Sequence, residues 1–98
     1  MVVLHLLCQE DCYVYQITQK VAKLSGNRFT LQEGSLYPTL YRLQEKGYVT
    51  DKVVISEENQ RLRKYYSITP SGREYLNELK QDYQTVIDGI SLIMSNQD

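Results

Sequence analysis

The last third of the chain carries an apolar stripe with the period of a long helix. Thr69-Pro70 has the form of a helix start, with threonine at the cap and proline at the first helical position, where its missing N–H costs nothing. Apolar residues follow at spacings of three and four, the a/d pattern of two helices packed along a seam. A chain of 98 residues has a limited core to cover such a helix. We therefore expect a homodimer with the interface residues Leu76, Leu79, Tyr83, Val86, Ile87, Ile90 and Ile93.

Two shorter helical patterns come first in the chain. Residues 2–8 have apolar side chains at helical spacing, and residues 13–24 repeat them at intervals of three and four. Asp11 is a candidate N-cap of the second helix. Gly26 follows its end, where glycine supplies a left-handed backbone. These signals predict two helices joined by a short connection.

A third helical pattern leads into two strand-like segments. After a stub of strand at 29–31, Thr30-Leu31-Gln32-Glu33 matches a capping box, with Gln32 or Glu33 as alternatives nearer the first turn, for a helix that runs to Lys46. Residues 48–56 are rich in β-branched side chains. Residues 62–69 alternate between apolar and polar side chains beyond a polar turn, which predicts a hairpin with a charged tip.

The order of these elements predicts the fold class. Three helices, a two-stranded wing and a long helix form the winged helix-turn-helix pattern, a mainly α fold with a small β-hairpin (α+β). We expect residues 1–69 to form a DNA-binding domain and residues 70–98 to form a C-terminal dimerisation helix of the same compact unit.

Charge is distributed unevenly along the chain. The formal net charge is −1, which taken alone argues against a nucleic-acid partner. Residues 20–73, however, hold ten of the eleven Lys and Arg residues against five Asp and Glu residues, a net +5. The flanking segments sum to −2 and −4. A basic middle between acidic ends fits either a nucleic-acid face or an ordinary solvated surface.

The third helix and the hairpin carry the candidate DNA-binding side chains. With Leu36, Leu40 and Leu43 directed to the core, short hydroxyls and cations gather on an adjacent arc of the third helix. Short side chains let a helix approach base edges, and an arginine there reads guanine or binds phosphate. A basic wing can hold the DNA backbone beside that helix. The candidates are Ser35, Tyr37, Pro38, Thr39, Arg42 and Lys46 on the helix and Arg61, Arg63 and Lys64 on the wing.

The chain contains nine tyrosines and no tryptophan. We expect most of them to pack the three-helix core with their hydroxyls at its rim. Tyr83 differs because it lies in the middle of the predicted seam. There it either packs against the partner or stacks on a flat ligand held between subunits. The expected core set is Tyr13, Tyr15, Tyr37, Tyr41, Tyr48, Tyr65 and Tyr66.

The sequence gives little support for an enzyme, a metal-binding protein or a membrane protein. His5 is the only histidine, so no catalytic triad forms, and the chain has no glycine-rich phosphate loop. Cys8 and Cys12 are too few for a zinc site and are expected as free thiols. No cofactor, metal or enzymatic activity is expected. The apolar start lacks a basic segment and no stretch is long enough to span a bilayer, which predicts a cytoplasmic protein without a membrane partner.

Two motifs resemble those of a known family. Residues 33–40, Glu-Gly-Ser-Leu-Tyr-Pro-Thr-Leu, followed by Arg42, are similar to the third-helix signature of the PadR family of bacterial regulators. Residues 63–69, Arg-Lys-Tyr-Tyr-Ser-Ile-Thr, followed by Gly72, are similar to that family's wing signature. Residues 13–17 lie where the family has a Gly-Tyr-Glu-Ile-like segment.

The resemblance implies a homodimeric winged-helix regulator, usually a repressor, that binds palindromic operator DNA. It also implies that a small planar aromatic effector can bind near the dimer interface and release the DNA, with Tyr83 as the candidate contact. The alternative left open by the acidic overall charge is a winged-helix protein-interaction module without DNA binding.

Overall fold

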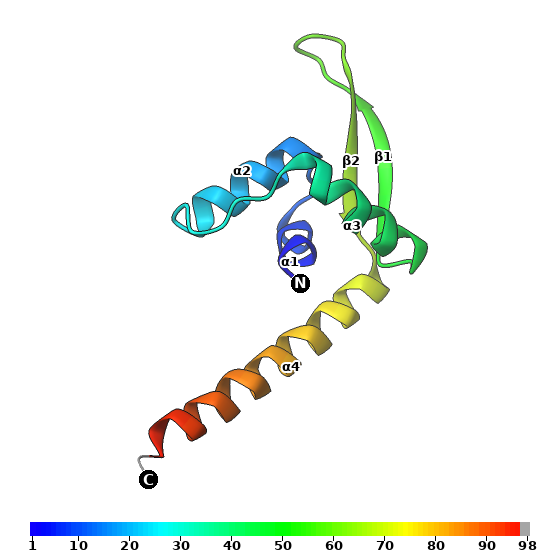
Figure 1. The fold of residues 1–98 in the computed structure, drawn as a ribbon. Helices are drawn as coiled ribbons and strands as arrows, with labels where there is room; N and C mark the ends of the chain where they lie inside the picture. Colours follow the sequence, from blue (N-terminus) through cyan, green and yellow to red (C-terminus); the bar gives the residue numbers. More distant parts are fainter. Residues whose placement is uncertain (97–98) are drawn as a thin grey trace.

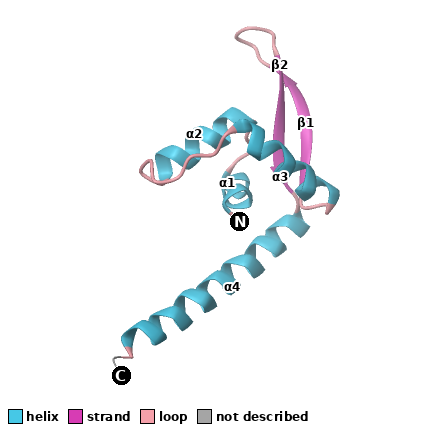
Figure 2. Ribbon diagram, in the orientation of Figure 1, coloured by secondary structure: helices cyan, strands magenta, loops and turns pink. Residues whose placement is uncertain are grey.

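The computed structural model describes residues 1–96, so the last two residues of the predicted 70–98 unit lie outside the described part. The elements follow the predicted order of three helices, a hairpin and a long helix (Figures 1 and 2). They are α1 (Val2–Gln9), α2 (Val14–Leu24), α3 (Glu33–Glu45), β1 (Val49–Ile55), β2 (Leu62–Ile68) and α4 (Pro70–Ser95).

The core lies where α1, α2 and α3 meet the base of the hairpin. Apolar residues at helical spacing turn inward from each helix, which confirms the periodicity used above. Leu36 and Leu40 of α3 are buried as predicted, and Leu43 packs partly against the same cluster. The fully buried side chains are Leu4 and Leu7 of α1, Cys12, Ile17, Leu36, Leu40, Val49, Tyr66 and Leu76.

The starts of α2 and α3 differ from the prediction. Tyr13, not Asp11, is the N-cap residue of α2, and its N–H donates to Oε1 of Gln16 at 3.1 Å. Asp11 instead pairs with Lys52 of β1 at 3.2 Å. The N-cap of α3 is Gln32, two residues after the predicted Thr30. The capping patterns located the right regions, and at α2 the ion pair with Lys52 engages the Asp11 side chain elsewhere.

The two strands form an antiparallel hairpin whose register runs from Val49 opposite Ile68 to Ile55 opposite Leu62. The predicted strand stub at 29–31 is wrong, because that segment is irregular in the structure. Instead, Cys12 forms an isolated antiparallel bridge with Tyr66 of β2. Its N–H donates to the Tyr66 carbonyl at 3.2 Å, and its carbonyl accepts from the Tyr66 N–H at 2.8 Å.

The start of α4 is fixed to the end of α3 by its cap. The Thr69 hydroxyl accepts from the Gly72 N–H at 3.0 Å and donates to the Gly47 carbonyl at 2.7 Å, which confirms the predicted cap. A Cβ on Gly72 would overlap the Tyr48 carbonyl oxygen, so only glycine permits this close approach. The rings of Tyr48 and Tyr75 stack at 4.3 Å across the same junction.

Beyond that junction α4 extends away from the domain (Figure 1). Leu76 is only 2% exposed and belongs to the chain's own core. Its prediction as a dimer-interface residue is therefore wrong. Leu79 packs partly against the core. The rest of the predicted seam is exposed: Tyr83, Val86, Ile87, Ile90 and Ile93.

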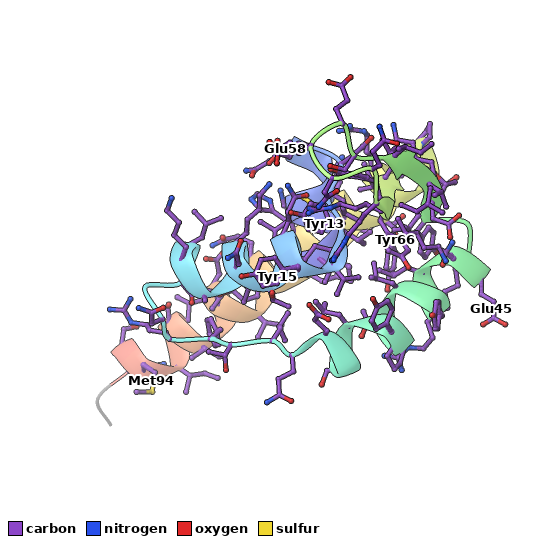
Figure 3. All side chains as sticks on the ribbon, turned by 90° about the horizontal axis from the view of Figure 1, so that it is seen from above. Tyr13, Tyr15, Glu45, Glu58, Tyr66 and Met94 are labelled. Atoms are coloured by element: carbon purple, nitrogen blue, oxygen red, sulfur yellow. The ribbon has the colours of Figure 1, made fainter. Side chains whose placement is uncertain are left out.

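The expectation of a tyrosine-rich core is wrong for three of its seven members, while Tyr13, Tyr48 and Tyr65 are half-buried and Tyr48 packs against the core. Only Tyr66 is buried, whereas Tyr15, Tyr37 and Tyr41 are exposed on α2 and α3. The aliphatic side chains already fill the space between the helices, which leaves the tyrosine rings at the surface. In Figure 3 Tyr66 lies at the hairpin next to α3.

Among the described residues, no helix combines the length and the apolar character needed to cross a membrane. The same residues hold no group of three or more histidine, cysteine and acidic side chains arranged to bind a metal ion. Both cysteines are free thiols, Cys12 buried and Cys8 half-buried. Burial raises the pKa of the Cys12 thiol against the opposing effect of Lys20, whose ammonium donates to its Sγ at 3.4 Å.

Candidate nucleic-acid interface

The outer face of α3 presents the predicted polar arc. Ser35, Arg42 and Lys46 are exposed, and Thr39 is half-buried. The Thr39 hydroxyl donates to the Ser35 carbonyl at 3.4 Å, one turn earlier in the same helix. Arg42 and Lys46 have no ion-pair partner among residues 1–96. Their charges are therefore available to an external anion.

Pro38 and Tyr37 lie in the middle of the same helix and are also exposed. Proline has no N–H, so the Gly34 carbonyl one turn earlier receives no bond from it. The Tyr37 ring lies 6.1 Å from the Tyr41 ring, centroid to centroid. This tyrosine pair flanks the polar arc and adds two hydroxyls to it.

Arg63 and Lys64 have different partners in the structure, although both line one cavity. Consecutive residues of a strand point to opposite faces, so Arg63 and Lys64 diverge. The Arg63 guanidinium lies 4.5 Å from the centroid of the Tyr13 ring at the start of α2. The Lys64 ammonium instead bonds to Asp51 of β1 at 3.1 Å and lies 5.9 Å from the Tyr66 ring.

The pair between Lys64 and Asp51 sets the charge of this part of the wing. The Lys64 hydrogen bond, followed by that of Gln44, lowers the pKa of Asp51, while Asp51 raises the pKa of Lys64. Both groups are thus charged at neutral pH. Because water and dissolved ions screen this exposed pair, it contributes little to the stability of the fold.

The turn at the tip of the wing has a defined backbone. The Gln60 N–H donates to the Ser56 carbonyl at 2.8 Å, and Asn59 Oδ1 accepts from the Arg61 N–H at 3.1 Å. Gln60 takes a positive φ of 56° to close the loop. Arg61 is exposed just beyond it, at the end of the hairpin far from the core.

A cavity of about 210 Å³ joins the pieces of this face. It lies between the start of α2, the start of α3 and strand β2, and Arg63, Lys64 and Tyr37 all line it. Glu33 of α3 also lines it. Among the described residues, the structure thus brings Tyr37 together with Arg63 and Lys64 around this cavity, whereas Ser35, Thr39, Arg42, Lys46 and Arg61 do not line it.

Sequence reasoning missed three contributors to this face. Tyr13 and Tyr15 border the same cavity, and Tyr13 also holds Arg63 in place. The paired tyrosines at the start of a helix were a visible signal, but they were assigned to the core. Asp51 was missed as well, because only the strand register places it next to Lys64.

Tyr83 lies on α4, away from the face formed by α3 and the wing. It lines a hollow of about 260 Å³ together with Lys80 and with residues Met1, Val2 and His5 at the start of α1. The ring is half-exposed and has no stacking partner among the described residues. A flat aromatic group can approach it from solvent.

Comparisons with known proteins agree with this architecture. The model of the transcriptional regulator PadR-like family matches residues 3–78. An uncharacterised protein of Lysinibacillus sphaericus is 34% identical over 97 residues, which cover 95% of this chain and 84% of that protein. A transcriptional regulator of Escherichia coli, YqjI, is 26% identical over 90 residues, which cover 92% of this chain but only 41% of the regulator.

Solved structures show the same fold. The PadR-like transcriptional regulator from Bacillus cereus superposes with a TM-score of 0.82 at 30% identity, covering 97% of this chain and 89% of the other. PadR of Bacillus subtilis in complex with operator DNA gives a TM-score of 0.69 at 26% identity, covering 80% of this chain and 42% of that one. The matched family consists of transcriptional regulators and not of enzymes. This chain belongs to the PadR-like family of transcriptional regulators.

Proposed function

We propose that this chain is a homodimeric repressor that binds operator DNA through α3 and the wing and acts in the cytoplasm, where the DNA is. The observation that carries the proposal is the pair of exposed cations Arg42 and Lys46 on α3, together with Arg63 and Lys64 of β2, which line a cavity at the start of the same helix. The Bacillus subtilis relative bound to operator DNA supports it, because the two chains share their fold over most of this one.

The residues divide into two expected roles on DNA. Ser35, Thr39 and Arg42 face outward on the helix and would meet base edges in the major groove. Lys46 at the end of the helix would meet the phosphate backbone. The wing cations would contact backbone phosphates, which position a protein without reading sequence. Tyr37 and Pro38 complete the helix surface, and Arg61, Arg63 and Lys64 complete the wing.

The unpartnered face of α4 supports the dimer. Its second half exposes a row of apolar side chains to solvent, and such a face is typical of a helix that packs on another. Two copies joined by a twofold axis would present two copies of α3 to DNA, which matches a palindromic site.

The test compares wild type with the double variant Arg42→Ala/Lys64→Ala on an operator recovered by selection from random DNA. We expect the double variant to lose operator binding and to remain as oligomeric as wild type by sedimentation. Lys80→Ala on α4 is the matched control and should bind as wild type does. Unchanged DNA affinity in the double variant would contradict the proposal, and recovery of a protein partner instead would favour an interaction module.

An effector would act through α4. The half-exposed Tyr83 beside a hollow at the start of α1 favours a small planar aromatic compound as the signal. We expect such a compound to quench tyrosine fluorescence in wild type but not in Tyr83→Leu, and to weaken operator binding only in wild type. A screen of planar compounds without either response would argue against an effector at this position.

A further inference from the structure

A buried polar group without a partner lies at the cavity between α2, α3 and strand β2. Tyr13, Tyr15 and Tyr66, which are labelled in Figure 3, all line this cavity of about 210 Å³. Tyr66 is 0% exposed, and its hydroxyl has no hydrogen-bond partner among the described residues. A buried hydroxyl without a partner destabilises the fold. A ligand that accepts a hydrogen bond in the cavity would remove this penalty.

Two helix N-termini meet at the same cavity. The first turn of α2 contributes Val14 and Tyr15 to its lining, and the first turn of α3 contributes Glu33. The N-cap residue of α3, Gln32, forms no side-chain cap hydrogen bond. Each helix N-terminus carries a partial positive charge and has N–H groups without intrahelical partners. Both features favour an anion as the ligand.

Two cations of β2 add further hydrogen-bond donors. The Arg63 guanidinium lies 4.5 Å from the centroid of the Tyr13 ring. It has a fork of N–H donors, more than the contact with one ring uses. The Lys64 ammonium bonds to Asp51 at 3.1 Å, and an ammonium likewise has more donors than this one bond uses. Both residues line the cavity, so both can bind an anion there without losing their present partners.

The buried position of Tyr66 favours a terminal phosphate over the phosphate of a DNA backbone. A backbone phosphate is a diester with a sugar on each side, so it can approach a protein only from the surface. A terminal phosphate has three free acceptor oxygens and about two negative charges at neutral pH. Such a group can enter the cavity and reach several donors at once, including a hydroxyl that is buried from solvent.

We propose that this cavity binds a terminal phosphate, either inorganic phosphate or a small phosphomonoester, through the Tyr66 hydroxyl, Arg63, Lys64 and the N-termini of α2 and α3. Glu33 is the one carboxylate that lines the cavity in the described part of the chain, and it opposes this ligand. Arg63 and Lys64 are also the wing cations of the proposed DNA contact, so a bound phosphate competes with operator DNA. The competition rests on the proposed function, whereas phosphate binding itself does not.

The test measures binding by NMR titration of the isotope-labelled chain, at constant ionic strength in a buffer without phosphate. Inorganic phosphate is the probe, and methyl phosphate, a monoester, and dimethyl phosphate, a diester like the DNA backbone, are compared with it. The amide signals of residues that line the cavity should shift and reach saturation with inorganic phosphate and with methyl phosphate. Dimethyl phosphate should bind at least about tenfold more weakly, equivalent to ~1.4 kcal/mol.

Two pairs of variants locate the site. Tyr66→Phe removes the unpartnered hydroxyl and should weaken phosphate binding by at least about tenfold. Tyr75→Phe is its matched control, because this ring stacks on Tyr48 at the start of α4, and it should bind phosphate as wild type does. Glu33→Gln removes the opposing carboxylate and should strengthen binding, whereas Glu45→Gln at the other end of α3 should not. Spectra recorded without phosphate check that each variant keeps the fold.

The outcomes separate the site from its effect on DNA. No signal shift at millimolar phosphate, or equal affinity in wild type and Tyr66→Phe, would overturn the site, and equal binding of dimethyl phosphate would overturn the choice of a terminal phosphate. Methyl phosphate should weaken operator binding more than sodium chloride of the same ionic strength does, and Tyr66→Phe should lose this difference. Equal effects of the two salts on wild type would contradict the competition. A wild type that binds methyl phosphate in the cavity but binds no operator would support the site and contradict the proposed DNA function.

Discussion

Tyr66 is the largest fully buried side chain of the described residues, and its hydroxyl has no hydrogen-bond partner among them. Its backbone pairs with Cys12, while its ring fills the space between the hairpin and α3. Burial raises the pKa of this hydroxyl, which keeps it neutral. The ring therefore stabilises the fold, whereas the hydroxyl opposes it.

Removing that hydroxyl is predicted not to destabilise the protein. A buried hydroxyl without a partner costs about 1–3 kcal/mol, so Tyr66→Phe should keep or raise the free energy of unfolding in urea. Tyr66→Ala, which removes the ring as well, should lower it by about 3–5 kcal/mol. A clear loss of stability in Tyr66→Phe would show that the hydroxyl is bonded after all.

Asp51 is predicted to weaken the proposed DNA contact. It neutralises Lys64 on the wing and places a carboxylate near the path of the DNA backbone. Asp51→Asn should bind operator more tightly, and the slope of log affinity against log salt should steepen by about 0.9 as one more cation meets phosphate. Glu78→Gln on α4 removes the same charge elsewhere and serves as control. Equal slopes in the two variants would count against the wing contact.

At the scale of elements, the junction between α3, β1 and α4 fixes the direction of the long helix. The Thr69 cap, the close approach at Gly72 and the stacked rings of Tyr48 and Tyr75 all meet there. Because α4 projects beyond the domain, a small change of angle at this junction moves its far end by many ångströms.

Gly72→Ala is predicted to disturb this junction. The added methyl group would overlap the Tyr48 carbonyl, and overpacking of this kind costs about 1–3 kcal/mol of the free energy of unfolding. Gly34→Ala in α3 meets open space and should keep or raise stability, since alanine favours helix. Equal unfolding midpoints for the two variants would mean that the junction is not closely packed.

Thr69→Val is predicted to loosen the cap itself. Valine keeps the branched shape but loses the bonds to the Gly72 N–H and the Gly47 carbonyl. The loss should be about 0.5–2 kcal/mol in urea unfolding, while Thr69→Ser should retain most of the stability. Serine keeps the hydroxyl and loses only the methyl group. A serine variant as unstable as the valine variant would therefore show that the methyl group matters and that the hydroxyl alone does not stabilise the cap.

The order and nature of the elements could be predicted from the sequence, because each depends on local signals. The Thr69-Pro70 cap and the alternation in residues 62–69 are contained within a few residues. Two of the errors involve distant partners. Cys12 pairs with Tyr66 across more than fifty residues, and Leu76 turns into the core although its spacing fits the seam equally well.

The same limit applies to the candidate site. The polar arc on α3 follows from helical geometry, so Arg42 and Lys46 are exposed where the sequence placed them. The divergence of Arg63 and Lys64 follows from strand alternation, but their partners Tyr13 and Asp51 depend on how α2 and β1 pack against β2. Those contacts appear only in the assembled fold.

At the scale of the whole molecule, the proposed function gives the domain and the projecting helix different roles: the domain contacts DNA and the helix contacts a second copy. The domain presents one polar face formed by α3 and the wing, and α4 extends the molecule to 64 Å in its longest dimension. The apolar side chains that the far half of α4 exposes support the proposed homodimer.

The most direct test is equilibrium binding of the purified chain to DNA upstream of its own gene, with salt and nonspecific competitor varied and the mass of the complex measured. The account predicts a competitor-resistant complex of two chains per duplex that weakens steeply with salt, because phosphate contacts release counterions. Absence of binding at micromolar protein, or binding that competitor abolishes, would contradict it.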